Sequence, residues 1–182
     1  MKDMPADIPE GLCIGAVPER ENPVDVFIST NGAGFKDMAS GSVIGTSSLR
    51  RGAQLQNARP DIVIQSIRGN LDTRLKKLES ENYDALVLAA AGVKRLNLEH
   101  KITEYLDAEV MLPAIGQGAL CVEIRENDPV MAPMVAAMEH APTRAVVAGE
   151  RAFLKRLEGG CQVPIAGHGK ISNNTYTLSG LV

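Results

Sequence analysis

Residues 41–51, GSVIGTSSLRR, decide the fold that the sequence predicts. A compact apolar run is followed at once by three hydroxyl side chains and by a helical pattern that continues to residue 58. The same order recurs twice, in the pairs 61–67 with 71–79 and 84–90 with 93–98. Because the apolar runs do not alternate with polar residues, each predicts a strand that is covered on both faces. We expect a doubly wound α/β lobe with a parallel sheet.

The segments on either side of this lobe predict smaller, separate elements. Prolines break residues 1–23 into short extended pieces, and residues 119–124 predict a strand of a different sheet. A helix is predicted over 141–160, opening near Pro142 and stopped by Gly159 and Gly160. Two antiparallel strands, 165–171 and 175–182, are expected to flank Asn173 and Asn174.

Composition excludes several classes of protein. The net charge of −3 and the 3% aromatic content argue against a nucleic-acid partner. No apolar run is long enough to span a bilayer, and the first residues lack the apolar core of a signal peptide. Cys13, Cys121 and Cys161 show no CxxC or Cys/His spacing, which argues against a disulfide framework and against a metal site. We therefore expect a cytoplasmic protein without a membrane partner.

Arginines follow all three predicted strands of the lobe. Open α/β sheets bind ligands beyond the carboxyl ends of their strands, where helix N-termini also offer backbone N–H groups. Arginines in a first helical turn oppose the helix dipole, and a bound anion would reverse that cost. Guanidinium groups also suit planar carboxylates better than ammonium groups do. The residues that we expect in one crevice for a polycarboxylate are Thr46, Ser47, Ser48, Arg50, Arg51, Arg68, Gly69, Arg74 and Arg95.

Two other interpretations of these arginines stay open. Any one of them could be a solvated surface residue. Phosphate could also occupy a helix N-terminus, but the sequence has no GxxxxGK[ST] loop and no GxGxxG after the first strand of the lobe, which disfavours a nucleotide.

Five blocks of the sequence together carry a resemblance to a known family. The blocks are GTSSLRRGAQL (45–55), RGNLDTRLKKL (68–78), YDALVLAAAGVKRL (83–96), LPAIGQGAL (112–120) and ERAFLKRLEGGCQVPIAG (150–167). They resemble porphobilinogen deaminase, the family also called hydroxymethylbilane synthase. The blocks cover nearly the whole chain in the family's order, and residues 1–5 match the end of a family segment HSMKDxP.

The resemblance implies a fold of three domains, the first two of them similar to periplasmic binding proteins. By that comparison, residues 1–18 and 119–137 are a remnant of the first domain, and 19–118 form the second. Residues 138–182 would then be part of a small α+β cofactor-attachment domain. We expect a fragment that lacks most of the first domain and the end of the third, with impaired activity.

The resemblance also implies a transferase that joins four porphobilinogen molecules into hydroxymethylbilane, releasing ammonia each time. Each porphobilinogen carries an acetate and a propionate, which the resemblance assigns to Arg50, Arg51, Arg68, Arg74 and Arg95. It further implies a monomer, located in the cytoplasm or, in a plant, in the plastid stroma.

Residues outside the lobe gain roles from the resemblance alone. Cys161 matches the cysteine that holds a dipyrromethane cofactor through a thioether, where the two preceding glycines would leave the sulfur accessible. Asp3 matches the catalytic aspartate, whose carboxylate would stabilise the positive charge that develops as ammonia leaves. The resemblance further implies that Lys2 binds a carboxylate and that Gln117, Gly118 and Ala119 line the crossing back toward the first domain.

The competing interpretation is a non-catalytic anion-binding module of the periplasmic-binding-protein type. Both interpretations use the arginine crevice. The segment LEGGCQVP (157–164) distinguishes them, because a binding module has no use for an accessible cysteine after two glycines.

Overall fold

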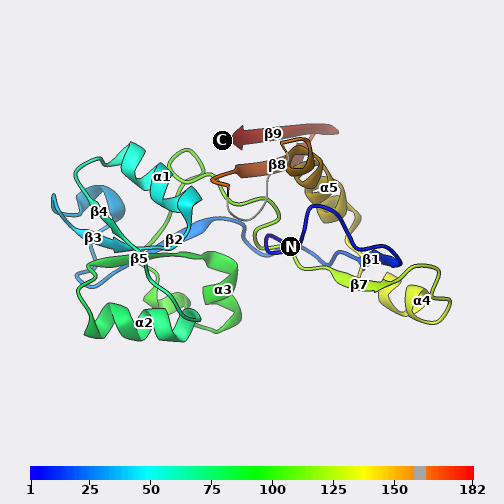
Figure 1. Ribbon diagram of the computed structural model, residues 1–182, viewed down its shortest axis with the longest axis horizontal. Helices are drawn as coiled ribbons and strands as arrows, with labels where there is room; N and C mark the ends of the chain where they lie inside the picture. Colours follow the sequence, from blue (N-terminus) through cyan, green and yellow to red (C-terminus); the bar gives the residue numbers. More distant parts are fainter. Residues whose placement is uncertain (158–162) are drawn as a thin grey trace. The chain divides into compact units, whose positions relative to one another are not determined.

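The computed structural model describes residues 1–157 and 163–182. The chain forms two compact units (Figure 1). One is continuous, from Val24 to Pro113, and the other combines Met1–Pro23 with Ala114–Val182. The domain boundaries expected from the resemblance stay a prediction.

The continuous unit is built on a five-stranded sheet in the order β4-β3-β5-β2-β6. The strands β3 (Val43–Gly45), β4 (Val63–Gln65) and β5 (Ala85–Ala89) run parallel, which confirms the predicted parallel core. The strands β2 (Asp25–Ser29) and β6 (Glu104–Tyr105) complete the sheet.

Helices cover both faces of this sheet, as a doubly wound lobe requires (Figure 1). On one face, α1 (Leu49–Ala58) and the short 3-10 helix η1 (Phe35–Asp37) bury Leu55 and Phe35 against Phe27 and Val87 of the sheet. On the other face, α2 (Leu71–Ser80) and α3 (Ala90–Arg95) pack on Val26 and Leu86. A second 3-10 helix, η2, spans Glu99–Lys101.

The strand β2 runs antiparallel to its neighbour β5, so the sheet is mixed. Asp25 pairs with Ala89, and Ser29 pairs with Ala85. A fully apolar run has the same appearance in a parallel and in an antiparallel strand when helices cover both faces. An apolar run of this kind therefore indicates a strand but not its direction.

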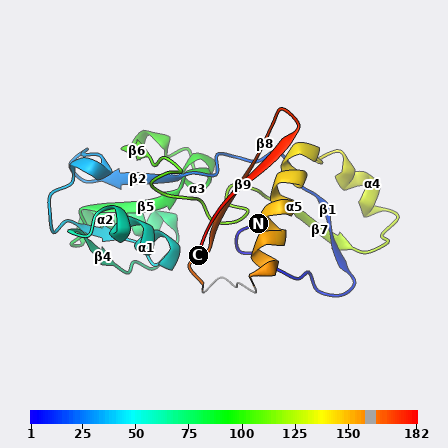
Figure 2. The same cartoon turned by 90° about the horizontal axis from the view of Figure 1, so that it is seen from above.

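The other unit contains two small sheets with one helix packed on each (Figure 2). The strands β1 (Leu12–Ala16) and β7 (Val122–Arg125) pair antiparallel, with α4 (Met131–Ala136) beside them. The helix α5 (Ala141–Arg156) packs on the hairpin of β8 (Ala166–Ser172) and β9 (Thr175–Leu181). Asn173 and Asn174 take the left-handed backbone that a two-residue hairpin turn needs, with φ of 48° and 60°. The separate sheet and the hairpin were both predicted from the sequence.

Candidate anion-binding site

The loop from β3 to α1 places hydroxyl groups at the carboxyl end of the parallel sheet. Ser48 caps α1, and its Oγ accepts a hydrogen bond from the backbone N–H of Arg51. The buried Thr46 accepts one from the backbone N–H of Ser48 at 3.2 Å. Ser47 donates through Oγ to the carbonyl oxygen of Ile67 at 2.6 Å and accepts from the backbone N–H of Ile67 at 3.1 Å. Ser47 therefore joins the loops that follow β3 and β4.

Arg50 and Arg51, in the first turn of α1, are buried around a carboxylate that the sequence analysis did not identify. Asp25, at the start of β2, is fully buried, and each arginine is only 6% exposed. The Asp25 Oδ1 atom accepts from Arg51 Nη2 at 2.7 Å and from Arg51 Nε at 3.0 Å. The Oδ2 atom lies 2.8 Å from Arg50 Nη1. Two cations thus share one internal anion.

Backbone carbonyls complete the surroundings of both guanidinium groups. Arg51 Nη1 donates to Val87 on β5 at 3.2 Å, and Arg50 Nη1 donates to Leu112 at 2.7 Å. The side chain of Gln54, one turn further along α1, accepts a hydrogen bond from the backbone N–H of Leu112 and donates one to the carbonyl oxygen of Leu112. Contacts with α1, with β5 and with Leu112 near the end of the unit therefore hold both guanidinium groups in place.

The pKa values in this cluster follow its charges. Burial alone would raise the pKa of Asp25, but the charges of Arg51 and Arg50, with their hydrogen bonds, hold it below its usual value. Burial lowers the pKa of Arg50, and the like charge of Arg51 lowers it further against the opposing effect of Asp25. Two guanidinium groups and one carboxylate give the cluster a formal net charge of +1.

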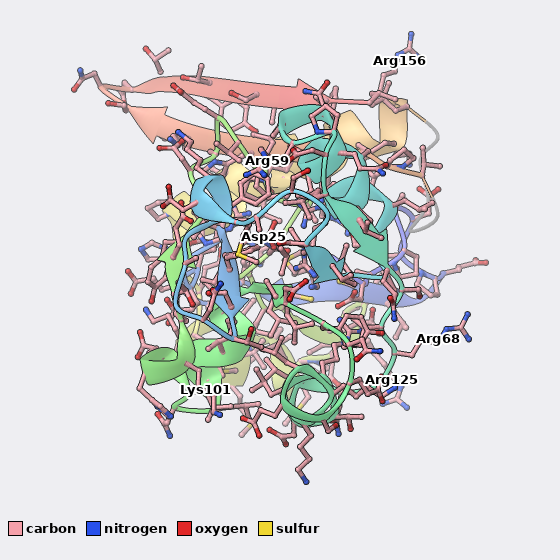
Figure 3. All side chains as sticks on the ribbon, turned by 90° about the vertical axis from the view of Figure 1, so that its left-hand side faces the viewer. Asp25, Arg59, Arg68, Lys101, Arg125 and Arg156 are labelled. Atoms are coloured by element: carbon pink, nitrogen blue, oxygen red, sulfur yellow. The ribbon has the colours of Figure 1, made fainter. Side chains whose placement is uncertain are left out.

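Arg68, Gly69 and Arg74 belong to the loop and helix that follow β4. Gly69 has a φ of +124°, a backbone conformation that favours glycine. Its carbonyl oxygen accepts from Arg74 Nε at 2.9 Å, and burial followed by the charge of Arg51 lowers the pKa of Arg74. Arg68 is exposed and extends outward, while Asp25 lies inside (Figure 3). Within the described ranges, neither Arg68 nor Arg74 forms an ion pair with a carboxylate.

The structure thus brings part of the predicted set together. Arg50 and Arg51 share Asp25, Arg74 is within electrostatic range of Arg51, and Ser47 links the loop that carries Arg68. Arg95 is the last residue of α3, about 9 Å along the helix axis from the end of β5. Its role, like the ligand-binding roles of the other residues, stays a prediction.

In the other unit, Lys2 and Asp3 are exposed beside the loop that carries Gln117, Gly118 and Ala119. The N-terminal ammonium donates to the carbonyl oxygen of Ala119 at 2.6 Å. Gln117 is buried and donates through Nε2 to the carbonyl oxygen of Pro23 at 2.6 Å. Backbone atoms of Met1 and Lys2 lie beside Gly116, and Gln117 is tied to Pro23 in the same unit.

This loop is anchored by a second ion pair that the sequence analysis missed. Glu150 on α5 is fully buried, and its Oε1 lies 2.7 Å from Arg20 Nη1. Its carboxylate also accepts the backbone N–H groups of Gly116 at 2.7 Å and Gly169 at 2.8 Å. One cation here balances one anion, and Arg20 Nε reaches the carbonyl oxygen of Gln117 at 2.8 Å.

Cys161, the predicted attachment residue, lies outside the described residues, as do Gly159 and Gly160. Cys13 and Cys121 are half-buried free thiols. Within the described part of the chain, no group of acidic, histidine and cysteine side chains could hold a metal ion. No helix there is long and apolar enough to cross a membrane.

Comparison with known families assigns nearly all of the chain. Residues 1–133 match the family model described as porphobilinogen deaminase, dipyromethane cofactor binding domain, and residues 144–182 match the model of its C-terminal domain. The chain belongs to the porphobilinogen deaminase family. This membership confirms the resemblance and disfavours the interpretation as a non-catalytic binding module.

Individual members of the porphobilinogen deaminase family agree with this assignment. Porphobilinogen deaminase of Bacillus cereus strain G9842 is 55% identical over the whole chain, and that of Bacillus thuringiensis strain Al Hakam is 54% identical. The chain spans 60% of the length of these relatives.

Among solved structures, a YaeC-family lipoprotein of Enterococcus faecalis V583 aligns with a TM-score of 0.47 at 15% identity. That alignment covers 78% of this chain and 68% of the lipoprotein.

Asp25 shows what sequence reasoning about this family member could have found. It is the one charged residue at the start of an otherwise apolar strand, DVFIS, where a carboxylate costs free energy unless it is paired. Two adjacent arginines in a first helical turn also need a nearby anion. The isolated carboxylate and the two arginines together indicate an ion pair between them. No local feature of the sequence indicated the ion pair between Arg20 and Glu150, because the two residues lie far apart in the sequence.

Proposed function

We propose that this chain is part of a porphobilinogen deaminase, which condenses four porphobilinogen molecules into hydroxymethylbilane and releases ammonia at each step. The observation that carries the proposal is 55% identity to a curated porphobilinogen deaminase over the whole chain. We further propose that the protein acts as a cytoplasmic monomer, or in the plastid stroma in a plant.

The arginine cluster is proposed to bind the carboxylates of the pyrrole substrate. Each porphobilinogen brings an acetate and a propionate, and guanidinium groups bind such planar anions through paired hydrogen bonds. Arg68 and Arg74, which lack carboxylate partners among the described residues, supply cations next to the buried Asp25–Arg50–Arg51 group. Arg95 and the hydroxyls of Thr46, Ser47 and Ser48 complete the proposed set.

A dipyrromethane cofactor fits the same chemistry, since it is two porphobilinogen units and carries four carboxylates. We propose that Cys161 holds it through a thioether and that Arg50, Arg51, Arg68 and Arg74 hold its acid groups. When bound, it would supply the pyrrole end to which the first substrate is joined. The net positive charge around Asp25 supports this fit.

Asp3 is proposed as the catalytic carboxylate. It would stabilise positive charge on the substrate as ammonia leaves and accept or return a proton there. Backbone atoms of Met1 and Lys2 lie beside Gly116, which supports a position for this carboxylate next to the loop of Gln117, Gly118 and Ala119. Lys2 would bind a substrate carboxylate, and Gln117, Gly118 and Ala119 would shape the crossing between domains.

The proposal is tested by incubating the purified chain with porphobilinogen and measuring intact mass and binding heat. We expect saturable binding, and an adduct of two porphobilinogen units less two ammonia that peptide mapping places on Cys161. Cys161→Ser should lose the adduct and Cys13→Ser should keep it. Absence of both binding and adduct, or an adduct on Cys13 instead, would contradict the proposal.

A further inference from the structure

The charge balance around Asp25 differs from that of the buried ion pair between Glu150 and Arg20. Glu150 meets one arginine, and two backbone N–H groups use its remaining acceptor capacity. Asp25 meets two arginines, and the charge of a third, Arg74, acts on Arg51. A pair that only stabilised the fold would be balanced, because an uncompensated buried charge is costly. Among the residues that the structure describes, no second carboxylate pairs with Arg50 or Arg51, which favours an anion from outside the chain as the group that balances the excess cation.

The contacts of the two arginines are also unequal. Arg51 uses Nε, Nη1 and Nη2 on Asp25 and Val87. Arg50 makes its contacts with Asp25 and Leu112 through Nη1 alone. Its Nε and Nη2 hydrogens, which lie along one edge of the guanidinium plane, are left for a carboxylate. That edge is the one that binds a carboxylate through two parallel hydrogen bonds.

We propose that Asp25 is a positioning residue of the acid-binding site, which fixes the guanidiniums of Arg50 and Arg51 so that Arg50 presents its Nε–Nη2 edge to a ligand carboxylate. This inference rests on the proposed function for the identity of the ligand. Asp25 acts through Arg50 and does not itself touch the ligand, whose carboxylate it would repel.

Removing the Asp25 charge therefore separates positioning from simple electrostatics. Asp25→Asn makes the site more positive, and electrostatics alone would tighten the binding of an acid. Loss of positioning predicts the opposite, a Kd for porphobilinogen raised about tenfold. Losing one well-oriented charge-assisted hydrogen bond to the ligand weakens binding by about that factor. Asp61→Asn is the matched control, because Asp61 is also paired with an arginine in the same unit but is exposed. The Kd of the Asp61→Asn variant for porphobilinogen should stay equal to that of the unmodified chain.

The orientation of Arg51 has a spectroscopic readout that needs no ligand. In the unmodified chain the Nε–H of Arg51 is bonded to Asp25, so its NMR signal should exchange slowly with water. Asp25→Asn should speed this exchange about 10- to 100-fold, and Asp61→Asn should leave it unchanged. If the unmodified chain fails to bind porphobilinogen, the proposed function loses its substrate, while this measurement still decides the role of Asp25.

Asp25→Asn leaves two buried cations unbalanced and can prevent folding. The double change Asp25→Asn with Arg51→Gln restores the net charge of +1 and keeps Arg50. We expect this variant to fold, with a Kd at least about tenfold above that of the unmodified chain, because Arg50 has lost its anchor and the guanidinium of Arg51 is absent as well. A Kd equal to or below that of the unmodified chain in either variant, or slow exchange of the Arg51 Nε–H without Asp25, would overturn the inference.

Discussion

Replacing Glu150 by glutamine is expected to destabilise the unit formed by residues 1–23 and 114–182 by about 3 kcal/mol. The change keeps the shape of the side chain but removes its charge, which leaves the guanidinium of Arg20 buried without a counterion. Breaking a buried ion pair costs roughly 3–5 kcal/mol, and the lower end applies because the amide oxygen can still accept one hydrogen bond. The amide NH2 group must then face the N–H of Gly116 or Gly169.

Urea unfolding followed by far-ultraviolet circular dichroism measures the total change, and hydrogen exchange with mass spectrometry locates it. Amides of β8 and of the loop at Gly116 should exchange faster, while those of β5 keep their protection because β5 belongs to the other unit. Glu123→Gln is the control, since Glu123 is exposed on β7 and its loss should cost less than about 0.5 kcal/mol. A loss below about 1 kcal/mol for Glu150→Gln, or a loss centred on β5, would refute the reasoning.

Two further predictions concern a glycine and an exposed ion pair. Gly118→Ala should cost about 3 kcal/mol by thermal unfolding, because φ is +82° and the new Cβ would lie 2.3 Å from the carbonyl oxygen of Glu21. Gly11→Ala, at φ +80° with no atom within 4 Å, tests the conformational part alone and should cost about 1 kcal/mol; equal losses would exclude the steric explanation. Hydrogen bonds from Arg59 lower the pKa of Asp61 to about 2, so a carbon-detected NMR titration should find its midpoint there. The stabilisation from this lowered pKa is present above the unfolded value of 3.8 and is lost as the pH falls toward 2. Arg59→Lys should raise the midpoint, and an unchanged midpoint would contradict the assigned cause.

The parallel core of the fold was predictable because its apolar runs are compact and each is followed by a helix with a recognisable first turn. The structure confirms the predicted strands that begin at Val43, Val63 and Ala85. It also confirms the turn at Asn173 and Asn174, because asparagine tolerates the left-handed backbone that this turn needs. The direction of β2 was not predictable, because burial on both faces removes the alternation that would distinguish its pairing.

The candidate site was predictable as a set of cations but not as an arrangement. The rule that ligands bind at strand ends selected Arg50, Arg51, Arg68, Arg74 and Arg95. It could not show that Arg50 and Arg51 are buried, since that depends on Asp25 from a strand that joins the sheet by a long-range pairing. Local sequence reports which charges are present, whereas their partners are decided by tertiary contacts.

The pairing of β2 with β5 has a consequence for synthesis on the ribosome. Asp25 lies near the beginning of the continuous unit and pairs with Ala89 toward its end, so the strand β2 of the nascent chain lacks its partner β5 until most of the unit has emerged. During that interval the apolar face of Val26–Ile28 stays accessible to chaperones and to other newly made chains. Slower translation before residue 85 would lengthen this vulnerable period, and the yield of folded protein would fall with it.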